Sequence, residues 1–170
     1  MYEASVPVFS QLLGGTSGTL DKMSAHCTEK KIDPSILLSA RLFPNMYTFG
    51  RQVQVASDWA NRACAWLGDV EPLTLTNEEA SVDELKARIA KVIAFINGID
   101  RAAINAGALR EISWKAGMTT RRMIGQDFLL HQALPQFYFH QTAAYSILRH
   151  NGVELAKRDF MGAVPRMTQS

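Results

Sequence analysis

Apolar residues recur at spacings of three and four along four stretches of the chain, which predicts four amphipathic helices. These helices are expected at about residues 3–31, 45–67, 82–104 and 126–151. The last helix has the clearest apolar face, formed by Ala133, Phe137, His140, Ala144, Ile147 and Leu148. Because successive helical residues are about 100° apart, these side chains lie on one side of the helix, and His140 is expected inside the protein.

A short additional helix is predicted between the first two long helices. Asp33 is a favourable N-cap, and Pro34 suits the first helical position. Pro44 disfavours helical backbone at the residue before it, so the short helix is expected to end at about Leu42.

Turn and capping residues set the other helix boundaries. Gly68 is expected as the C-cap of the second long helix, followed by a surface loop over residues 69–80. Ser81 and Glu84 have the spacing of a capping box and start the third long helix. Pro135 cannot donate a backbone hydrogen bond, so it is expected to kink the last helix.

Residues 108–125 do not follow the helical pattern. Ile112 and Trp114 alternate with polar neighbours, and a Lys-Ala-Gly turn follows them, so a small β-hairpin is expected; a frayed helix or a plain loop also fits. Arg121 and Arg122 form the one local basic spot of this segment. A solvated edge is the favoured interpretation, with an anion site at the mouth of the bundle as the alternative.

The second long helix presents a polar side that is expected to face solvent, made of Arg51, Gln54, Asp58, Asn61 and Arg62. Gln52 differs from these residues because it lies between Phe49 and Ala56, at the edge of the apolar stripe. A buried amide without partners costs about 1–3 kcal/mol, so Gln52 is expected to have a hydrogen-bond partner.

Large apolar side chains extend the apolar surface of the same helix beyond what one core needs. These residues are Val55, Trp59 and Trp66. Tryptophan is enriched at protein–protein contacts, so a homodimer is expected.

Size and composition fit one cytoplasmic domain. The 170 residues are expected to form a single domain over residues 1–170, with about 161–170 as a frayed tail. Apolar residues make up 47% and charged residues 20%, and the net charge is only +2, without the basic stripe that nucleic-acid-binding proteins usually show. No apolar run reaches the roughly 20 residues of a membrane span. Cys27 and Cys64 are expected to be buried free thiols.

Three segments resemble an uncharacterised bacterial family of the DinB/YfiT-like superfamily. They are KIDPSILLSARLFPNMYTFGRQVQVASDWA, LKARIAKVIAFI and FYFHQTAAYSILRHNGVELAKRDFMG. The resemblance implies an all-α fold: an up-down-down-up four-helix bundle, commonly a homodimer, here with one short extra helix and a small β-hairpin before the last helix. The superfamily includes metal-binding proteins and thiol-dependent transferases, whose metal is typically held by one histidine on the second helix and an HxxxH pair on the last.

The sequence departs from that metal triad. His140 matches the final histidine of the pair, but Gln136 stands four residues earlier, and Gln52 takes the place of the second-helix ligand. Amide oxygen is a weak ligand for Zn²⁺ or Ni²⁺, so we expect that the metal site is lost and that no cofactor is bound. A metal centre would need His140 together with a carboxylate, or with His26, from elsewhere in the chain.

Three functions remain open on this basis. The favoured hypothesis is a small-molecule-binding or interaction module that acts as a homodimer, with Gln52, Gln136 and His140 as pocket residues. The first alternative is an enzyme, a metal- or thiol-dependent transferase or hydrolase that uses His140. The second is a purely structural dimer, in which the three polar side chains form a buried hydrogen-bond network that only sets the packing of the helices. Neither nucleic acid nor a membrane is expected as a partner.

Overall fold

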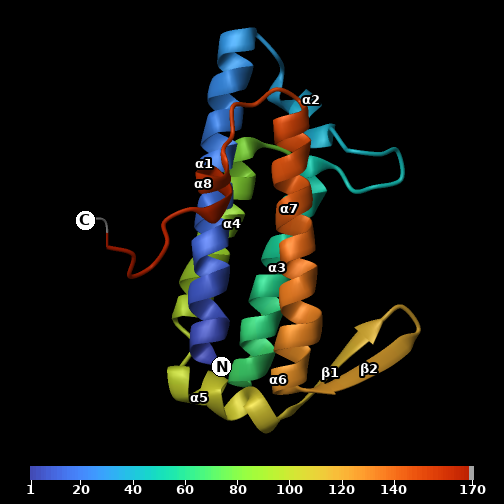
Figure 1. The fold of residues 1–170 in the computed structure, drawn as a ribbon. Helices are drawn as coiled ribbons and strands as arrows, with labels where there is room; N and C mark the ends of the chain where they lie inside the picture. The colour runs from blue at the N-terminus through green and yellow to red at the C-terminus, as the bar shows by residue number, and fades with distance from the viewer. Residues whose placement is uncertain (169–170) are drawn as a thin grey trace.

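Four long helices form a bundle in the computed structural model, which describes residues 1–168 (Figure 1). They are α1 (Val6–Lys30), α3 (Phe49–Gly68), α4 (Val82–Asn97) and α7 (Leu134–His150). Helix α1 runs up in Figure 1, α3 and α4 run down, and α7 runs up again. This is the predicted up-down-down-up bundle. Because α3 and α4 are parallel, the chain must return along the bundle between them, and residues 69–81 make this crossover.

Short elements connect and extend the bundle. In chain order they are a 3-10 turn at Tyr2–Ala4, α2 (Pro34–Ser39), α5 (Arg101–Ala106), a 3-10 turn at Gly107–Leu109, β1 (Glu111–Ala116), β2 (Thr119–Ile124), α6 (Gly125–Phe128), a π-helical turn at Leu129–Ala133 and α8 (Lys157–Met161).

The predicted apolar stripes of the long helices meet in the core. Phe9, Phe49 and Phe137 are fully buried, and the rings of Phe9 and Phe137 make an edge-to-face contact with centroids 4.8 Å apart. Such pairs contribute about 0.5–1.5 kcal/mol beyond the area that they bury. The stripe of the last helix is buried as predicted, including His140.

Both ends of the α2–α3 connection differ from the prediction. Helix α2 ends at Ser39 rather than Leu42, because Ala40 adopts an extended backbone and its carbonyl accepts a hydrogen bond from Phe49 N. Helix α3 begins at Phe49 rather than residue 45. The Thr48 side chain caps it by accepting a hydrogen bond from Arg51 N.

Gly68 is not the C-cap that the sequence predicted. It is the last residue of α3, and Asp69 follows as the cap in the left-handed conformation, with φ of 58°. The reason for glycine at position 68 is close packing, since a Cβ there would lie 2.4 Å from Ile99 Cγ2.

The third predicted helix is two helices. Helix α4 ends at Asn97 with Gly98 as its cap, and α5 starts after Asp100, whose side chain accepts a hydrogen bond from Ala103 N. The axis of α4 and the axis of residues 101–109 differ by 81°. The break lets Ile104 enter the core, so that Ile104 is buried while Ala103 is only half-buried.

The last helix is irregular where Pro135 removes a hydrogen bond, as predicted, but the irregularity takes the form of a π-helical turn. This turn spans Leu129–Ala133, directly before α7. A π turn adds one residue to a helical repeat, and such turns are frequent at functional sites.

The predicted β-hairpin is confirmed. Strands β1 and β2 pair antiparallel, with Trp114 opposite Arg121, and Ile112 and Trp114 are buried. Two glycines allow the base of the hairpin to pack tightly against the bundle. A Cβ on Gly125 would lie 2.0 Å from Gly107 O, and one on Gly107 would lie 2.2 Å from Leu67 O.

The C-terminal segment packs along α1. Val153 and Leu155 are buried, and the Gln11 side chain donates a hydrogen bond to Met161 O. Of the predicted frayed tail, about 161–170, residues 169 and 170 lie outside the described residues.

No single helix among residues 1–168 is both long and apolar enough to cross a membrane. The bent pair of α4 and residues 101–109 meets the length and composition criteria only when the two helices are taken together.

Candidate functional site

His140 and Gln52 meet across the contact between α7 and α3. His140 Nδ1 lies 2.6 Å from Gln52 Oε1, and both side chains are buried. An amide oxygen only accepts hydrogen bonds, so Nδ1 carries the proton and the neutral ring presents the lone pair of Nε2. Gln52 Nε2 donates a longer hydrogen bond, of 3.4 Å, to Tyr47 O.

The surroundings of His140 favour its neutral form. Burial lowers the pKa of His140 to about 4, and the positive charge of Arg51 acts in the same direction. Tyr47 stacks on the imidazole with ring centroids 6.2 Å apart, and Phe139 meets it edge to face at 5.2 Å. The ring is therefore an uncharged hydrogen-bonding group near neutral pH.

Gln136 does not take part in this pair. Within the described chain it forms no side-chain hydrogen bond with Gln52 or His140. Instead it lines a cavity of about 590 Å³ between α3, the hairpin and the π turn, which we call the tryptophan cavity. Its lining residues are Trp59, Arg62, Trp66, Ser113, Trp114, Lys115, Ala116, Arg121, Gln132 and Gln136.

The residues present do not fit a three-ligand metal centre. Across residues 1–168, no three His, Cys, Asp or Glu side chains come together in a group that could hold a metal ion. The ring of His140 meets an amide oxygen at Nδ1, and an amide is a poor donor for Zn²⁺ or Ni²⁺. His26, the other histidine considered as a ligand, lies beside Gly152 and Glu154 instead.

The two thiols are poorly suited to nucleophilic chemistry. Cys27 and Cys64 are free and buried, as predicted. Burial raises the pKa of both thiols, most strongly for Cys64, so neither provides a thiolate near neutral pH.

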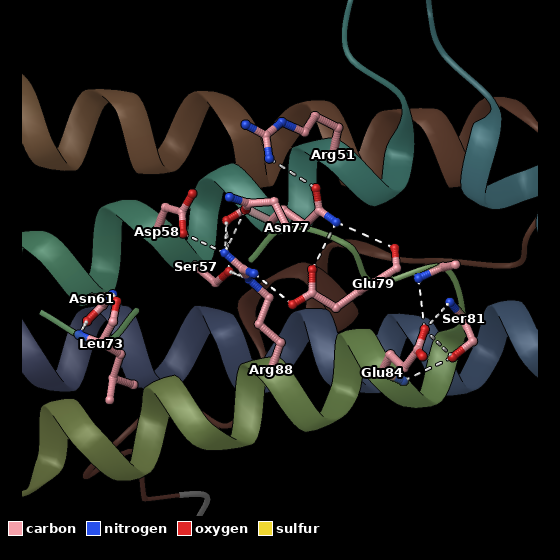
Figure 2. A network of polar contacts seen from close by, with 12 residues as sticks. Arg51, Ser57, Asp58, Asn61, Leu73, Asn77, Glu79, Ser81, Glu84 and Arg88 are labelled. Carbon is pink, nitrogen blue, oxygen red and sulfur yellow. Dashed lines mark hydrogen bonds and ion pairs between the residues drawn. The ribbon is translucent and has the colours of Figure 1, made fainter. Parts of the chain in front are cut away.

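The polar side of α3 is solvated only in part. Arg62 is exposed, as predicted, and Arg51 is half-buried, but the prediction was wrong for the other three residues. Asn61 is 1%, Gln54 5% and Asp58 8% exposed. These side chains are covered by the crossover segment and by Arg88 of α4, as Figure 2 shows. No pattern in the sequence indicates that Arg88 is buried, because an arginine at the edge of the apolar face of an amphipathic helix normally reaches solvent.

Arg88 is the centre of a buried polar network (Figure 2). Its guanidinium donates to Ser57 Oγ at 2.6 Å and binds the carboxylates of Asp58 and Glu79 at 2.5 and 2.8 Å. It also donates to Asn77 Oδ1 at 3.0 Å. Burial raises the pKa of Asp58, and the nearby charge of Arg88 opposes that shift. The network joins α3, α4 and the crossover.

A second contact holds the crossover to α3. Asn61 Nδ2 donates to Leu73 O at 2.9 Å, and Leu73 N donates to Asn61 Oδ1 at 3.0 Å. The amide pairs with the Leu73 backbone as a neighbouring strand would. Most of the buried polar groups of α3 therefore have a structural role, because they hold the crossover and α4 in place. The His140–Gln52 pair and the tryptophan cavity remain as the candidate site.

Comparisons with known proteins agree with this architecture. No curated protein matches the chain. The solved structure of a DinB family member from Shewanella denitrificans is 35% identical, covers 99% of this chain and 95% of its own, and superposes with a TM-score of 0.91. The model of the domain of unknown function DUF1993 matches residues 1–161. The chain therefore belongs to the DUF1993 family and has the fold of the DinB proteins.

Proposed function

We propose that this protein is a small-molecule-binding module built on a DinB-like bundle whose metal site has degenerated, and that it acts as a cytoplasmic homodimer. The observation that supports this proposal best is the contact between His140 and Gln52. The imidazole that corresponds to a metal ligand in the superfamily pairs at 2.6 Å with an amide. The tryptophan cavity, which Gln136 lines but Gln52 and His140 do not, supplies room for a ligand elsewhere along α3 and α7.

Metal analysis of protein purified without a histidine tag tests the loss of the metal site. We expect substoichiometric Zn, Ni and Fe in the wild type, and no difference from His140→Ala. Stoichiometric metal that disappears in His140→Ala would instead support the enzyme alternative, in which Nε2 of His140 is the retained ligand.

The homodimer rests on exposed aromatic side chains next to His140. Phe139 is 58% and Tyr47 52% exposed, and both rings contact the imidazole. Exposed aromatic clusters commonly mark protein–protein contacts. By contrast, Trp66 is partly used inside the chain, since it packs on Phe128 with ring centroids 5.7 Å apart.

Light scattering at micromolar concentration tests the dimer. A dimer that dissociates in Phe139→Ser would support this surface as the interface. A wild-type monomer would exclude both the dimer proposed here and the purely structural dimer.

A further inference from the structure

We propose that the tryptophan cavity binds a small molecule that carries an aromatic ring and an anionic group, either a carboxylate or a phosphate monoester. This inference rests on the proposed small-molecule function and adds the class of ligand. Arg62 and Arg121 bind the anionic group, and the indole rings of the cavity receive the aromatic ring.

The α3 wall of the cavity brings a cation and two indoles to one helix face. Trp59, Arg62 and Trp66 follow one another at i, i+3 and i+7, a spacing that places them on the same side of the helix. Both tryptophans are half-buried, and Arg62 is exposed. This wall therefore offers flat apolar surface next to a guanidinium.

The hairpin supplies the second cation. Arg121 is the direct cross-strand partner of Trp114, and side chains opposite each other in an antiparallel pair lie on the same face of the sheet. Trp114 is buried against the bundle, so Arg121 emerges on the side that faces the cavity. Alternation along the strand directs Arg122 to the other face, where it lies 3.7 Å from Glu111.

Both arginines are available for a ligand. In the part of the chain that the structure describes, neither Arg62 nor Arg121 forms an ion pair, and the cavity lining contains no Asp or Glu. The nearest acid on α3, Asp58, binds Arg88 instead. Guanidinium groups match carboxylate and phosphate oxygens in geometry, so two of them at one cavity without an acid favour an anion.

The indole surfaces are held in position by packing. Phe128 contacts Trp66 at 5.7 Å and Trp114 at 5.2 Å between ring centroids, which fixes two walls against each other. Indole faces bind planar rings by stacking. The amides of Gln132 and Gln136, from the π turn and α7, add hydrogen-bonding groups that can orient such a ring.

Intrinsic fluorescence reports on this cavity directly, because all three tryptophans of the chain line it. Titration with benzoate and with phenyl phosphate, excited at the red edge of indole absorption, measures binding. Benzamide is the neutral counterpart with the same ring, and cyclohexanecarboxylate is the anion without aromatic character. We expect benzoate or phenyl phosphate to bind at least about tenfold more tightly than either control compound.

The arginine variants locate the anion. Arg62→Gln and Arg121→Gln are expected to weaken binding of the anionic aromatic probe by about tenfold or more each, since each removes a charge-assisted contact. Arg122→Gln is the matched control, adjacent in sequence but on the other face of the hairpin, and is expected to leave binding unchanged. Circular dichroism spectra identical to that of the wild type verify that each variant is folded.

Two results would overturn the inference in different ways. If benzamide binds as tightly as benzoate, or if Arg62→Gln and Arg121→Gln bind like the wild type, the ligand class is wrong while the small-molecule function stands. If none of the four probes perturbs the tryptophans up to millimolar concentration, both the ligand class and the proposed function of the cavity fail.

Discussion

Gln52 Oε1 lies 2.6 Å from His140 Nδ1, and this contact determines which neutral tautomer the one buried histidine on α7 adopts. The amide oxygen accepts the Nδ1 proton, so Gln52 stabilises one neutral tautomer. Burial and Arg51 disfavour the charged form in addition. The consequences for stability follow from these two effects.

Stability should fall in acid because His140 must charge when the protein unfolds. Its folded pKa is about 4, below the ordinary value of 6.5. Between these values the unfolded chain binds the extra proton and the folded chain does not, so the free energy of unfolding drops as pH decreases from about 6.5 to about 4, by about 3 kcal/mol in total. Denaturant titrations across this range should show that slope in the wild type, and a shallower one in His140→Gln. Equal slopes would mean that His140 titrates normally.

Removal of one member of the His140–Gln52 pair should lower the stability of the protein more than removal of both. His140→Leu leaves the buried Gln52 Oε1 without its partner, which should lower stability by about 1–3 kcal/mol. The double variant Gln52→Leu/His140→Leu removes both polar groups and should recover most of that loss. A double-mutant cycle from chemical denaturation measures the coupling. A double variant less stable than His140→Leu would show that the pair is needed for the fold, as in the purely structural alternative.

Loss of the Arg88 guanidinium should be among the most damaging changes in the chain. Arg88→Met leaves the carboxylate of Asp58 without its ion-pair partner and that of Glu79 with only the amide of Gln54, and breaking a buried pair costs about 3–5 kcal/mol. Lys86→Met is the matched control two residues earlier on α4, where the ion pair with Asp21 is largely exposed. Its effect should stay below about 1 kcal/mol. Thermal or urea unfolding compares the two, and similar losses would refute the structural role of the network.

The crossover should open locally without Asn61. Asn61→Ala removes both hydrogen bonds to the Leu73 backbone and should lower stability by about 1–3 kcal/mol. Hydrogen exchange at the Leu73 amide should accelerate strongly, because its acceptor is gone. Asn61→Asp keeps an oxygen for that amide and should protect it better than alanine does. An unchanged exchange rate in Asn61→Ala would show that other contacts hold the crossover.

The helices of the core were predictable because their signals are local. The apolar residues of segment 126–151 lie on one face of any helix that this segment forms. The capping box of Ser81 and Glu84 forms as predicted. The break after Asn97 was overlooked although Gly98 and the N-cap Asp100 mark it, since the apolar spacing continues through Ile99. No local sequence pattern predicts that Arg88 and Asn61 are buried, because the burial of each side chain depends on where the crossover lies.

The sequence alone determined which residues form the bundle and that His140 faces inward, since helical periodicity depends only on spacing along the chain. Only the tertiary structure decided the partners of the polar groups. It paired His140 with Gln52, placed Gln136 in a separate cavity, and brought Arg62 and Arg121, 59 positions apart, to that same cavity. Such contacts join distant segments, and their geometry is set by how helices, hairpin and crossover pack against one another.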